Sequence, residues 1–335
     1  MGIDLPLIWG VIIIFSIMMY VVMDGFDLGI GMLFPFFPEK DDRDIMMNTV
    51  APVWDGNETW LVMGGAGLLA AFPLAYAVVL SALYLPLILM LVALIFRGVA
   101  FEFRFKVEEG KERAWDWAFI AGSYGATFFQ GVVLGAFING FAMDGDRFVG
   151  GAFDWFTPFS TFTGVGLVVA YMLLGSTWLL IKTEGELHDD LRLRTRHWVW
   201  ALLGAIVVVS IWTAMSQPAI AERWFSMPNL LFFAPVPLLV GAVMFWLMRS
   251  LSGESHTSPF LLTLALVFLG YSGLGISIWP NILPPDISFW EAAGPPQSLG
   301  FTLVGALLII PIILGYTGLA YWVFRGKVRA GEGYH

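Results

Sequence analysis

The sequence predicts an all-helical protein that crosses a membrane many times. Of its 335 residues, 58% are hydrophobic and only 13% are charged, and the mean hydropathy is +0.79. Soluble domains carry roughly 25% charged residues, so a water-exposed surface could not be covered with so few. Apolar runs of about 20 residues, the length that crosses the hydrocarbon core of a bilayer, recur along the chain. We therefore expect a single transmembrane domain over residues 1–335.

Nine apolar runs define the expected helices. The second run is rich in glycine and begins with polar residues. The N-terminus lacks the basic stretch of a cleavable signal peptide, so the first run is expected to remain as a helix. The spacings Gly25/Gly29 and Gly64/Gly67 are expected to let helices approach one another closely. The expected spans are 7–34, 54–73, 76–104, 115–140, 157–182, 198–215, 229–249, 259–280 and 300–324.

Lysine and arginine predict the orientation. With nine spans, 14 of the 17 fall in alternate connections and in the C-terminal tail, on one side of the membrane. The other side holds Arg147 and Arg223, and Arg97 lies within the third run. Cytoplasmic loops carry the excess of Lys and Arg, so we expect the N-terminus outside and the C-terminus in the cytoplasm. Five tryptophans near the outer ends would form an aromatic belt: Trp9, Trp155, Trp224, Trp279 and Trp290.

The composition also limits which ligands and partners this chain is expected to bind. The net charge is −9 and most of the surface should face lipid, so a nucleic-acid partner is not expected. The absence of cysteine excludes disulfides and thiolate metal sites, and no Walker-type loop indicates ATP. Histidine is absent from the depth of the apolar runs, where a haem ligand would be needed. The four histidines, expected in loops, at a helix mouth or at the last residue, are His188, His197, His256 and His335.

Ionisable residues lie inside the first three apolar runs, all toward the expected cytoplasmic end. Such residues are costly in a membrane and usually mark a pathway or a buried pair. Residues three apart share a helix face, and carboxylates at the start of a helix are favoured by its dipole. The residues are Asp24 and Asp27 in the first run, Asp55 and Glu58 in the second, and Arg97, Glu102 and Arg104 in the third.

Two interpretations of this polar group are open. In one, the carboxylates pass protons inward from the cytoplasm, and Arg97 keeps one of them ionised. In the other, the charges form a structural network that clamps three helices together near the lipid headgroups. Asp55 is the expected partner of Arg97, so that its loss would leave the arginine buried and unpaired.

Five motifs, in order along the chain, resemble those of subunit II of the cytochrome bd-type quinol oxidases. The resemblance covers essentially the whole sequence. The short loops and the segment WPNILPP (279–285) are similar to the compact, cyanide-insensitive branch. The motifs are MDGFDLGIGM (23–32), APVWDGNETWL (51–61), FRGVAFEFR (96–104), TEGELH (183–188) and IPIILGYT (310–317).

The resemblance implies a fold of two four-helix bundles plus one peripheral helix, in a multi-pass protein of the bacterial cytoplasmic membrane. It implies a complex that oxidises quinol and reduces O2 to water, generating a proton gradient without pumping. Haems b and d and the quinol site would lie in the partner, subunit I, and this chain would bind no cofactor. Small single-helix subunits, membrane lipid and quinone would be further partners.

The resemblance also assigns roles to residues. A cytoplasmic proton path would use Asp27, Asp55, Arg97 and Glu102, where Glu102 replaces the aspartate of some members. Asp24 and Glu58 would support that path. Trp60 matches the tryptophan beside a lateral O2 route. No residue of this chain would be catalytic in itself.

Without the resemblance, the residues are also compatible with two other functions. A proton-coupled secondary transporter would use the same carboxylates, and it would be expected to have discontinuous helices at the midplane and inverted repeats. A scaffold that only holds its partner in the bilayer would need none of them to titrate. An oxidase subunit should purify together with a haem-bearing partner, whereas a transporter should not.

Overall fold

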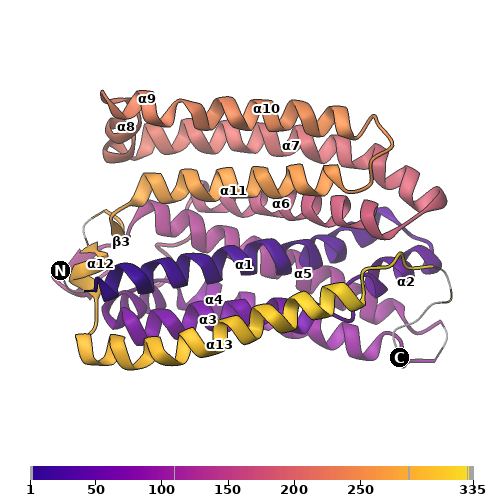
Figure 1. Cartoon of the computed structure of the whole chain (residues 1–335), viewed down its shortest axis with the longest axis horizontal. Helices are drawn as coiled ribbons and strands as arrows, with labels where there is room; N and C mark the ends of the chain where they lie inside the picture. The colour runs from indigo at the N-terminus through magenta and orange to yellow at the C-terminus, as the bar shows by residue number, and fades with distance from the viewer. Residues whose placement is uncertain (1–2, 109, 286, 330, 332–335) are drawn as a thin grey trace.

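The computed structural model describes residues 3–108, 110–285, 287–329 and 331. Long helices run side by side along one axis, and the first helix begins at the end of the molecule opposite to where the last helix ends (Figure 1). In the described part of the chain, eight helical segments are long and apolar enough to cross a membrane. They are Leu5–Phe36, Pro73–Phe103 (α4), Arg113–Asn139 (α5), Pro158–Lys182 (α6), Gly185–Ser216 (α7), Asn229–Ser250, Ser258–Ile278 (α11) and Pro296–Val323 (α13).

Two of these segments are composite, and shorter elements fill the connections. The first joins α1 (Leu5–Leu33) to a 3-10 helix (Phe34–Phe36), and the sixth joins α9 (Asn229–Phe233) to α10 (Pro235–Ser250). The remaining helices are α2 (Lys40–Asn48), α3 (Trp54–Ala71), α8 (Pro218–Phe225) and α12 (Phe289–Ala292). Two small antiparallel hairpins pair β1 (Met143–Asp144) with β2 (Arg147–Phe148), and β3 (Asn281–Leu283) with β4 (Ile287–Ser288).

The helix α3 corresponds to the second expected span but is not among the eight apolar ones in the described part of the chain. It has 18 residues, about 27 Å at 1.5 Å per residue, and its first two turns are polar. It packs lengthwise against α1, and α13 lies beside it. In these polar turns Asn57 and Glu58 face neighbouring helices, whereas Asp55 and Thr59 are exposed.

Local sequence explains where most helices begin. Proline occupies the first or second position of α4, α6, α8, α10, α11 and α13, where its missing N–H costs no hydrogen bond. Thr157 accepts from the backbone N–H of Ser160, whose hydroxyl accepts from the backbone N–H of Thr157, so both ends of this capping box are made.

The helix α7 is longer than expected. It begins at Gly185 instead of residue 198, so His188 and His197 lie in a helix and not in a loop. The additional turns are rich in charged residues and extend beyond the apolar part that hydropathy detects. The amphipathic helix α2 in the first connection was not expected either.

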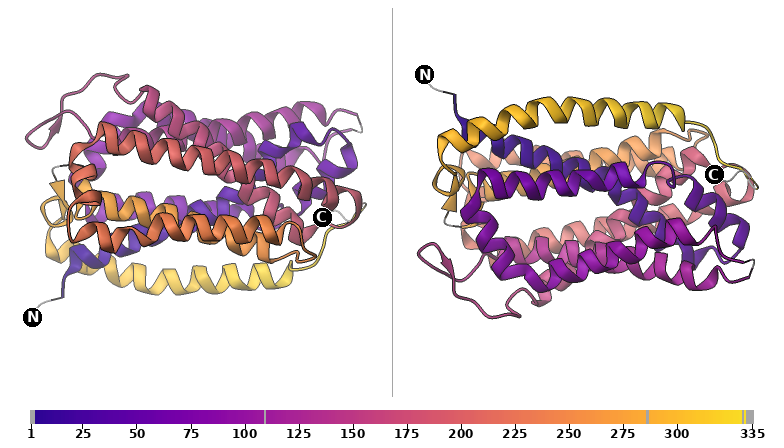
Figure 2. Two further views of the ribbon diagram at one scale, coloured as in Figure 1. Left: turned by 90° about the horizontal axis from the view of Figure 1, so that it is seen from above. Right: turned by 90° about the horizontal axis from the view of Figure 1, so that it is seen from below.

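The centre of the molecule is α1, which contacts α3, α5, α6, α11 and α13. On one side α3, α4 and α5 pack around it, and α6 leads to a second layer of α7, α10 and α11 (Figure 2). The helix α13 lies on the outside, since Leu299 and Ala306 are its only buried residues among those described. Of the buried charged side chains, Asp24, Asp27 and Arg97 lie where α1, α3 and α4 meet.

Candidate functional site

A buried arginine joins three helices near one end of the molecule. Arg97 on α4 and Asp24 on α1 have no exposed surface. The Arg97 guanidinium donates from Nη1 to Asp24 Oδ1 at 2.6 Å and from Nη2 to Glu58 Oε2, on α3, at 3.0 Å. Its carbon lies 5.9 Å from the centre of the Trp54 ring, which covers it from α3. A buried arginine with two carboxylates is a strong charge-assisted contact.

A second buried carboxylate has no cation of its own. Asp27, also without exposed surface, accepts a hydrogen bond at Oδ2 from Asn57 Nδ2 at 2.8 Å. Asn57 in turn accepts at Oδ1 from the Tyr321 hydroxyl of α13 at 2.8 Å. Within the described residues, Asp27 Oδ1 has no hydrogen-bond partner. Asp27 is thus held by neutral groups only.

The charges of this group do not balance. Three carboxylates, of Asp24, Asp27 and Glu58, lie with the one guanidinium of Arg97, so full ionisation would leave a net charge of −2. An unpaired buried charge costs several kcal/mol, and the burial of Asp27 without a cation makes it the carboxyl best placed to hold a proton. We call Asp24, Asp27, Glu58 and Arg97 the carboxylate cluster.

A polar cleft of about 410 Å³ leads from the surface to Asn57, the hydrogen-bond partner of Asp27. It lies between the start of α3, the end of α4 and the end of α13. Asn57 and Tyr321 line its inner part, and the exposed side chains of Asp55 and Glu102 line its mouth. A hydrogen-bonded connection therefore runs from the cleft through Tyr321 and Asn57 to Asp27.

The sequence-predicted residues thus separate into two groups. Asp24, Asp27, Glu58 and Arg97 come together in the core, whereas Asp55 and Glu102 remain at the surface. The expectation that Asp55 would be the partner of Arg97 is wrong, because α3 begins at Trp54 and its first turn directs Asp55 into the cleft while Glu58 faces Arg97. The side chain of Glu102 is 59% exposed and pairs with Lys106 at 2.9 Å.

Two residues of the site were missed. Asn57 lies within the polar start of α3 and could have been found there, since an amide among carboxylates in an apolar helix is unusual. No feature of the sequence marked Tyr321 as a site residue, because it lies among aromatic residues at the end of the last helix. Its partner is 264 residues away along the chain.

Trp60 is fully buried next to the cluster. It packs with Tyr20 and Met23 of α1, and its ring meets that of Phe15 edge to face at 5.6 Å between centroids. Its indole Nε1 has no hydrogen-bond partner in the described parts of the chain. Its surroundings are therefore apolar, apart from the Tyr20 hydroxyl.

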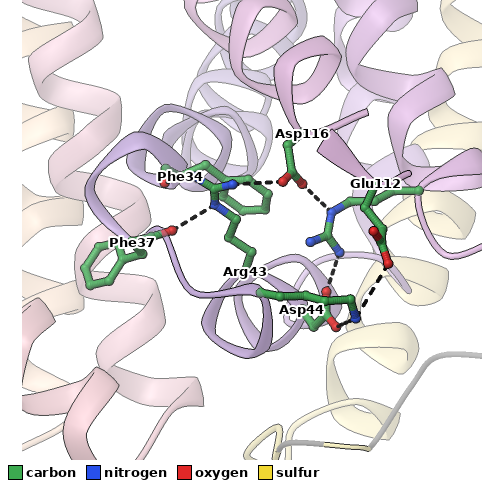
Figure 3. Close-up of polar contacts among 8 residues, drawn as sticks. Phe34, Phe37, Arg43, Asp44, Glu112 and Asp116 are labelled. Carbon is green, nitrogen blue, oxygen red and sulfur yellow. Dashed lines mark hydrogen bonds and ion pairs between the residues drawn. The ribbon is translucent and has the colours of Figure 1, made fainter. Parts of the chain in front are cut away.

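A separate charged cluster lies at the helix ends beyond the carboxylate cluster (Figure 3). Asp116 on α5 accepts from Arg43 Nη1 at 2.8 Å and from Arg104 Nε at 2.6 Å. Arg104 Nη1 also donates to Asp44 on α2 at 2.5 Å. Both guanidinium groups lie within 5.8 Å of the centre of the Phe34 ring. We call this group the end clamp.

The end clamp differs from the carboxylate cluster in its charge balance. Lys40 Nζ donates to Asp44 Oδ2 at 2.8 Å and lies 3.9 Å from Glu112, so three cations face three carboxylates. The hydrogen bond to Asp44 raises the pKa of Lys40 above its ordinary value, because the carboxylate favours the charged form of the lysine. A balanced network of this kind is suited to joining α2, α4 and α5. Asp44 and Asp116 were not predicted, although they lie in the charge-rich segments KDDRD (40–44) and KERAWD (111–116).

The described histidines do not form part of a metal-binding group. His188 is buried at the start of α7 and packs against His256 with ring centroids 4.6 Å apart, while His197 is exposed. His335 lies outside the described residues. Across the described ranges, no three His, Asp or Glu side chains are grouped as a metal ion would need.

The fold and the site define a class: a multi-pass helical membrane protein with an unbalanced group of buried carboxylates near one end. A family model described as cytochrome bd terminal oxidase subunit II matches residues 5–324. The chain is 31% identical over 365 residues to cytochrome bd-I ubiquinol oxidase subunit 2 of Escherichia coli, covering 97% of this chain and 95% of that protein. It is 28% identical over 336 residues to cytochrome bd ubiquinol oxidase subunit 2 of Bacillus subtilis, covering 97% of each.

A solved structure agrees at the level of the fold. The bd oxidase from Geobacillus thermodenitrificans superposes with a TM-score of 0.77 at 16% identity, covering 96% of this chain and 99% of that chain. The chain belongs to the cytochrome bd terminal oxidase subunit II family, and it is a subunit of a terminal oxidase complex. The resemblance seen in the five motifs is thereby confirmed.

Proposed function

We propose that this chain is the haem-free subunit II of a quinol:O2 oxidoreductase and supplies its cytoplasmic proton path. The complex would oxidise quinol and reduce O2 to water, generating a proton gradient without pumping. Subunit I would hold haems b and d and the quinol site, and small single-helix subunits, lipid and quinone would be further partners. The observation that carries the proposal is the buried carboxylate cluster, which has more acids than cations and is connected through Asn57 to a polar cleft.

We propose a topology of nine spans in the bacterial cytoplasmic membrane, with α3 as the ninth. The N-terminus would be outside and the C-terminus inside, and the helices would form two four-helix bundles with α13 peripheral. The cation bias supports this orientation, because the end that holds α2 and the C-terminus carries most Lys and Arg. In this orientation the cleft opens to the cytoplasm.

The path would begin at the mouth of the cleft, where Asp55 and Glu102 attract protons from water. Tyr321 and Asn57 would connect the cleft to Asp27 by their hydrogen bonds. Asp27 would hold the proton in transit, while Arg97 keeps Asp24 and Glu58 as its partners. A carboxyl group without a cation can accept and release a proton with less cost than one in a tight ion pair.

The test compares neutral isosteres inside the cluster and at its mouth. Asp27→Asn keeps the shape but removes the titrating proton, and we expect quinol oxidase turnover of the intact complex to fall about a hundredfold. Asp55→Asn and Asp55→Leu should both slow turnover less, and neither should prevent assembly, since Asp55 is not the partner of Arg97. Wild-type turnover in Asp27→Asn, with normal haem spectra, would show that the cluster is structural.

The haem-free role can be tested separately. We expect the intact complex to show haem b and haem d absorption and the isolated chain to show none, since, of the described histidines, His188 and His256 lie at or beside helix ends and His197 is exposed. Stoichiometric haem on the chain after removal of subunit I would contradict this part of the proposal.

We also propose that O2 enters laterally beside Trp60. The support is the apolar packing of this ring between α1 and α3, which offers O2 a less polar route than the cleft. Trp60→Phe removes part of the bulk and should change the KM for O2 without changing kcat or haem content. An unchanged KM for O2 in a fully assembled variant would place the route elsewhere.

A further inference from the structure

Three polar side chains continue inward from the carboxylate cluster toward the middle of the molecule. They come from three helices: Tyr20 from α1, Gln130 from α5 and Tyr171 from α6. Tyr20 and Tyr171 are almost fully buried, with 4% and 1% of their surface exposed. The Tyr171 hydroxyl donates to Gln130 Oε1 at 3.1 Å, and Gln130 Nε2 donates to the Tyr20 hydroxyl at 2.7 Å.

These contacts have a direction. Because the carbonyl of the Gln130 side chain accepts from Tyr171, its NH2 group faces Tyr20. The oxygen of Tyr20 is therefore used as an acceptor, and its own proton is available for another group. An amide turned the other way would instead take that proton for itself.

Asp24 is the acceptor within reach. It lies four residues after Tyr20 on α1, so both side chains share one helix face. One Asp24 oxygen, Oδ1, is taken by Arg97. The other, Oδ2, is buried and has no hydrogen-bond partner in the part of the chain that the structure describes.

We propose that Tyr171, Gln130 and Tyr20 form a one-way hydrogen-bond chain that ends on Asp24 Oδ2. With Arg97 on one oxygen and Tyr20 on the other, Asp24 is fixed as an acceptor on both sides. Asp27 has one neutral donor and a second oxygen without a partner. The exchangeable proton of the carboxylate cluster therefore lies on Asp27, and Tyr20 is a positioning residue that keeps it there.

This inference rests on the proposed proton path, but it makes a claim of its own about where the proton lies. Two carboxyl groups three residues apart on one buried helix cannot both be ionised beside a single arginine that is shared with Glu58. A donor aimed at one of them decides which remains ionised. Without the chain, Asp24 and Asp27 would compete for the proton.

Infrared difference spectroscopy of the intact oxidase complex tests this claim, because a protonated carboxyl has its own C=O stretching band. We expect the wild type to show one such band from this cluster and Asp27→Asn to lose it. Tyr20→Phe should add a second band, as Asp24 begins to share the proton. Tyr171→Phe, which does not touch Asp24 but releases the Gln130 amide, should produce the same band at lower intensity.

Tyr84→Phe is the matched control, since Tyr84 is exposed on α4 and should leave the spectrum unchanged. If Tyr20→Phe and Tyr171→Phe both show the wild-type carboxyl bands, the chain does not end on Asp24 and the inference is overturned. The proposed function is judged independently by turnover in Asp27→Asn. Wild-type turnover there together with a new band in Tyr20→Phe would reject the proton path and leave the hydrogen-bond chain standing.

Discussion

At the scale of residues, charge balance separates two clusters that look alike in the sequence. Arg97 and Arg104 are seven residues apart on one helix, and each binds two carboxylates. Arg104 belongs to the end clamp, in which cations and carboxylates are equal in number. Arg97 belongs to the carboxylate cluster, which has more carboxylates than cations. A proton path needs a site that can gain and lose a proton, and only the second arrangement offers one at low cost.

The end clamp should affect stability and not proton uptake. Asp116 accepts from both Arg43 and Arg104, and an asparagine could accept from only one of them. We expect Asp116→Asn to destabilise the complex by about 1–3 kcal/mol, measured as a lower thermal unfolding temperature in detergent. Glu108→Gln, at a side chain that is 80% exposed, is the control and should have no effect. A stable Asp116→Asn complex with slow proton uptake would reverse the roles of the two clusters.

Sequence reasoning found the buried ionisable residues because charge inside an apolar run is conspicuous. It could not assign their partners, since these depend on how each helix is rotated. The rotation of α3 directs Glu58 to Arg97 and leaves Asp55 in the cleft. Tyr321 was out of reach for a different reason: nothing in the last helix indicates that its end lies beside the start of α3.

At the scale of elements, glycine fixes how closely α1 and α6 cross. A Cβ on Gly29 would lie 2.0 Å from the carbonyl oxygen of Tyr171, and one on Gly25 would lie 3.0 Å from the Tyr171 ring. The expected close approach at Gly25 and Gly29 is therefore confirmed. This crossing also sets the position of Tyr171, the first residue of the proposed hydrogen-bond chain.

Gly29→Ala should consequently separate the two helices. Overpacking of this kind costs about 1–3 kcal/mol, and a backbone atom cannot move away as a side chain can. We expect a lower thermal unfolding temperature and lower yield of the assembled complex. Gly204→Ala on α7, where a Cβ would meet nothing within 4 Å, should be neutral or slightly stabilising. Equal behaviour of the two variants would contradict the close crossing.

Hydropathy predicted the apolar helices well and their polar ends poorly. The apolar part of α7 gave an expected helix, whereas its charged first turns did not, because charged turns resemble a loop by composition alone. Hydropathy was insufficient for α3 for a different reason. Its glycine-rich, partly polar sequence is not apolar enough to indicate a span by itself, and its role depends on the neighbours that cover it.

At the scale of the whole molecule, the chain gathers its charges at one end. The C-terminal segment is held there, since Lys182 Nζ donates to the Phe324 carbonyl at 2.5 Å and the Val328 N–H donates to the Lys182 carbonyl at 2.9 Å. The carboxylate cluster, the cleft and the end clamp lie toward the same end as α2 and the C-terminus. The proposed proton entry and the end clamp are therefore neighbouring but separate features of one end.

The central claim is that protons reach the oxidase through Asp27. The most direct measurement is proton uptake by the complex in vesicles during an O2 pulse, followed with a pH-indicating dye on the side of the C-terminus. We predict that Asp27→Asn slows this uptake about a hundredfold, while Asp116→Asn takes up protons at the wild-type rate. Wild-type uptake in Asp27→Asn, with its haems spectrally normal, would contradict the account.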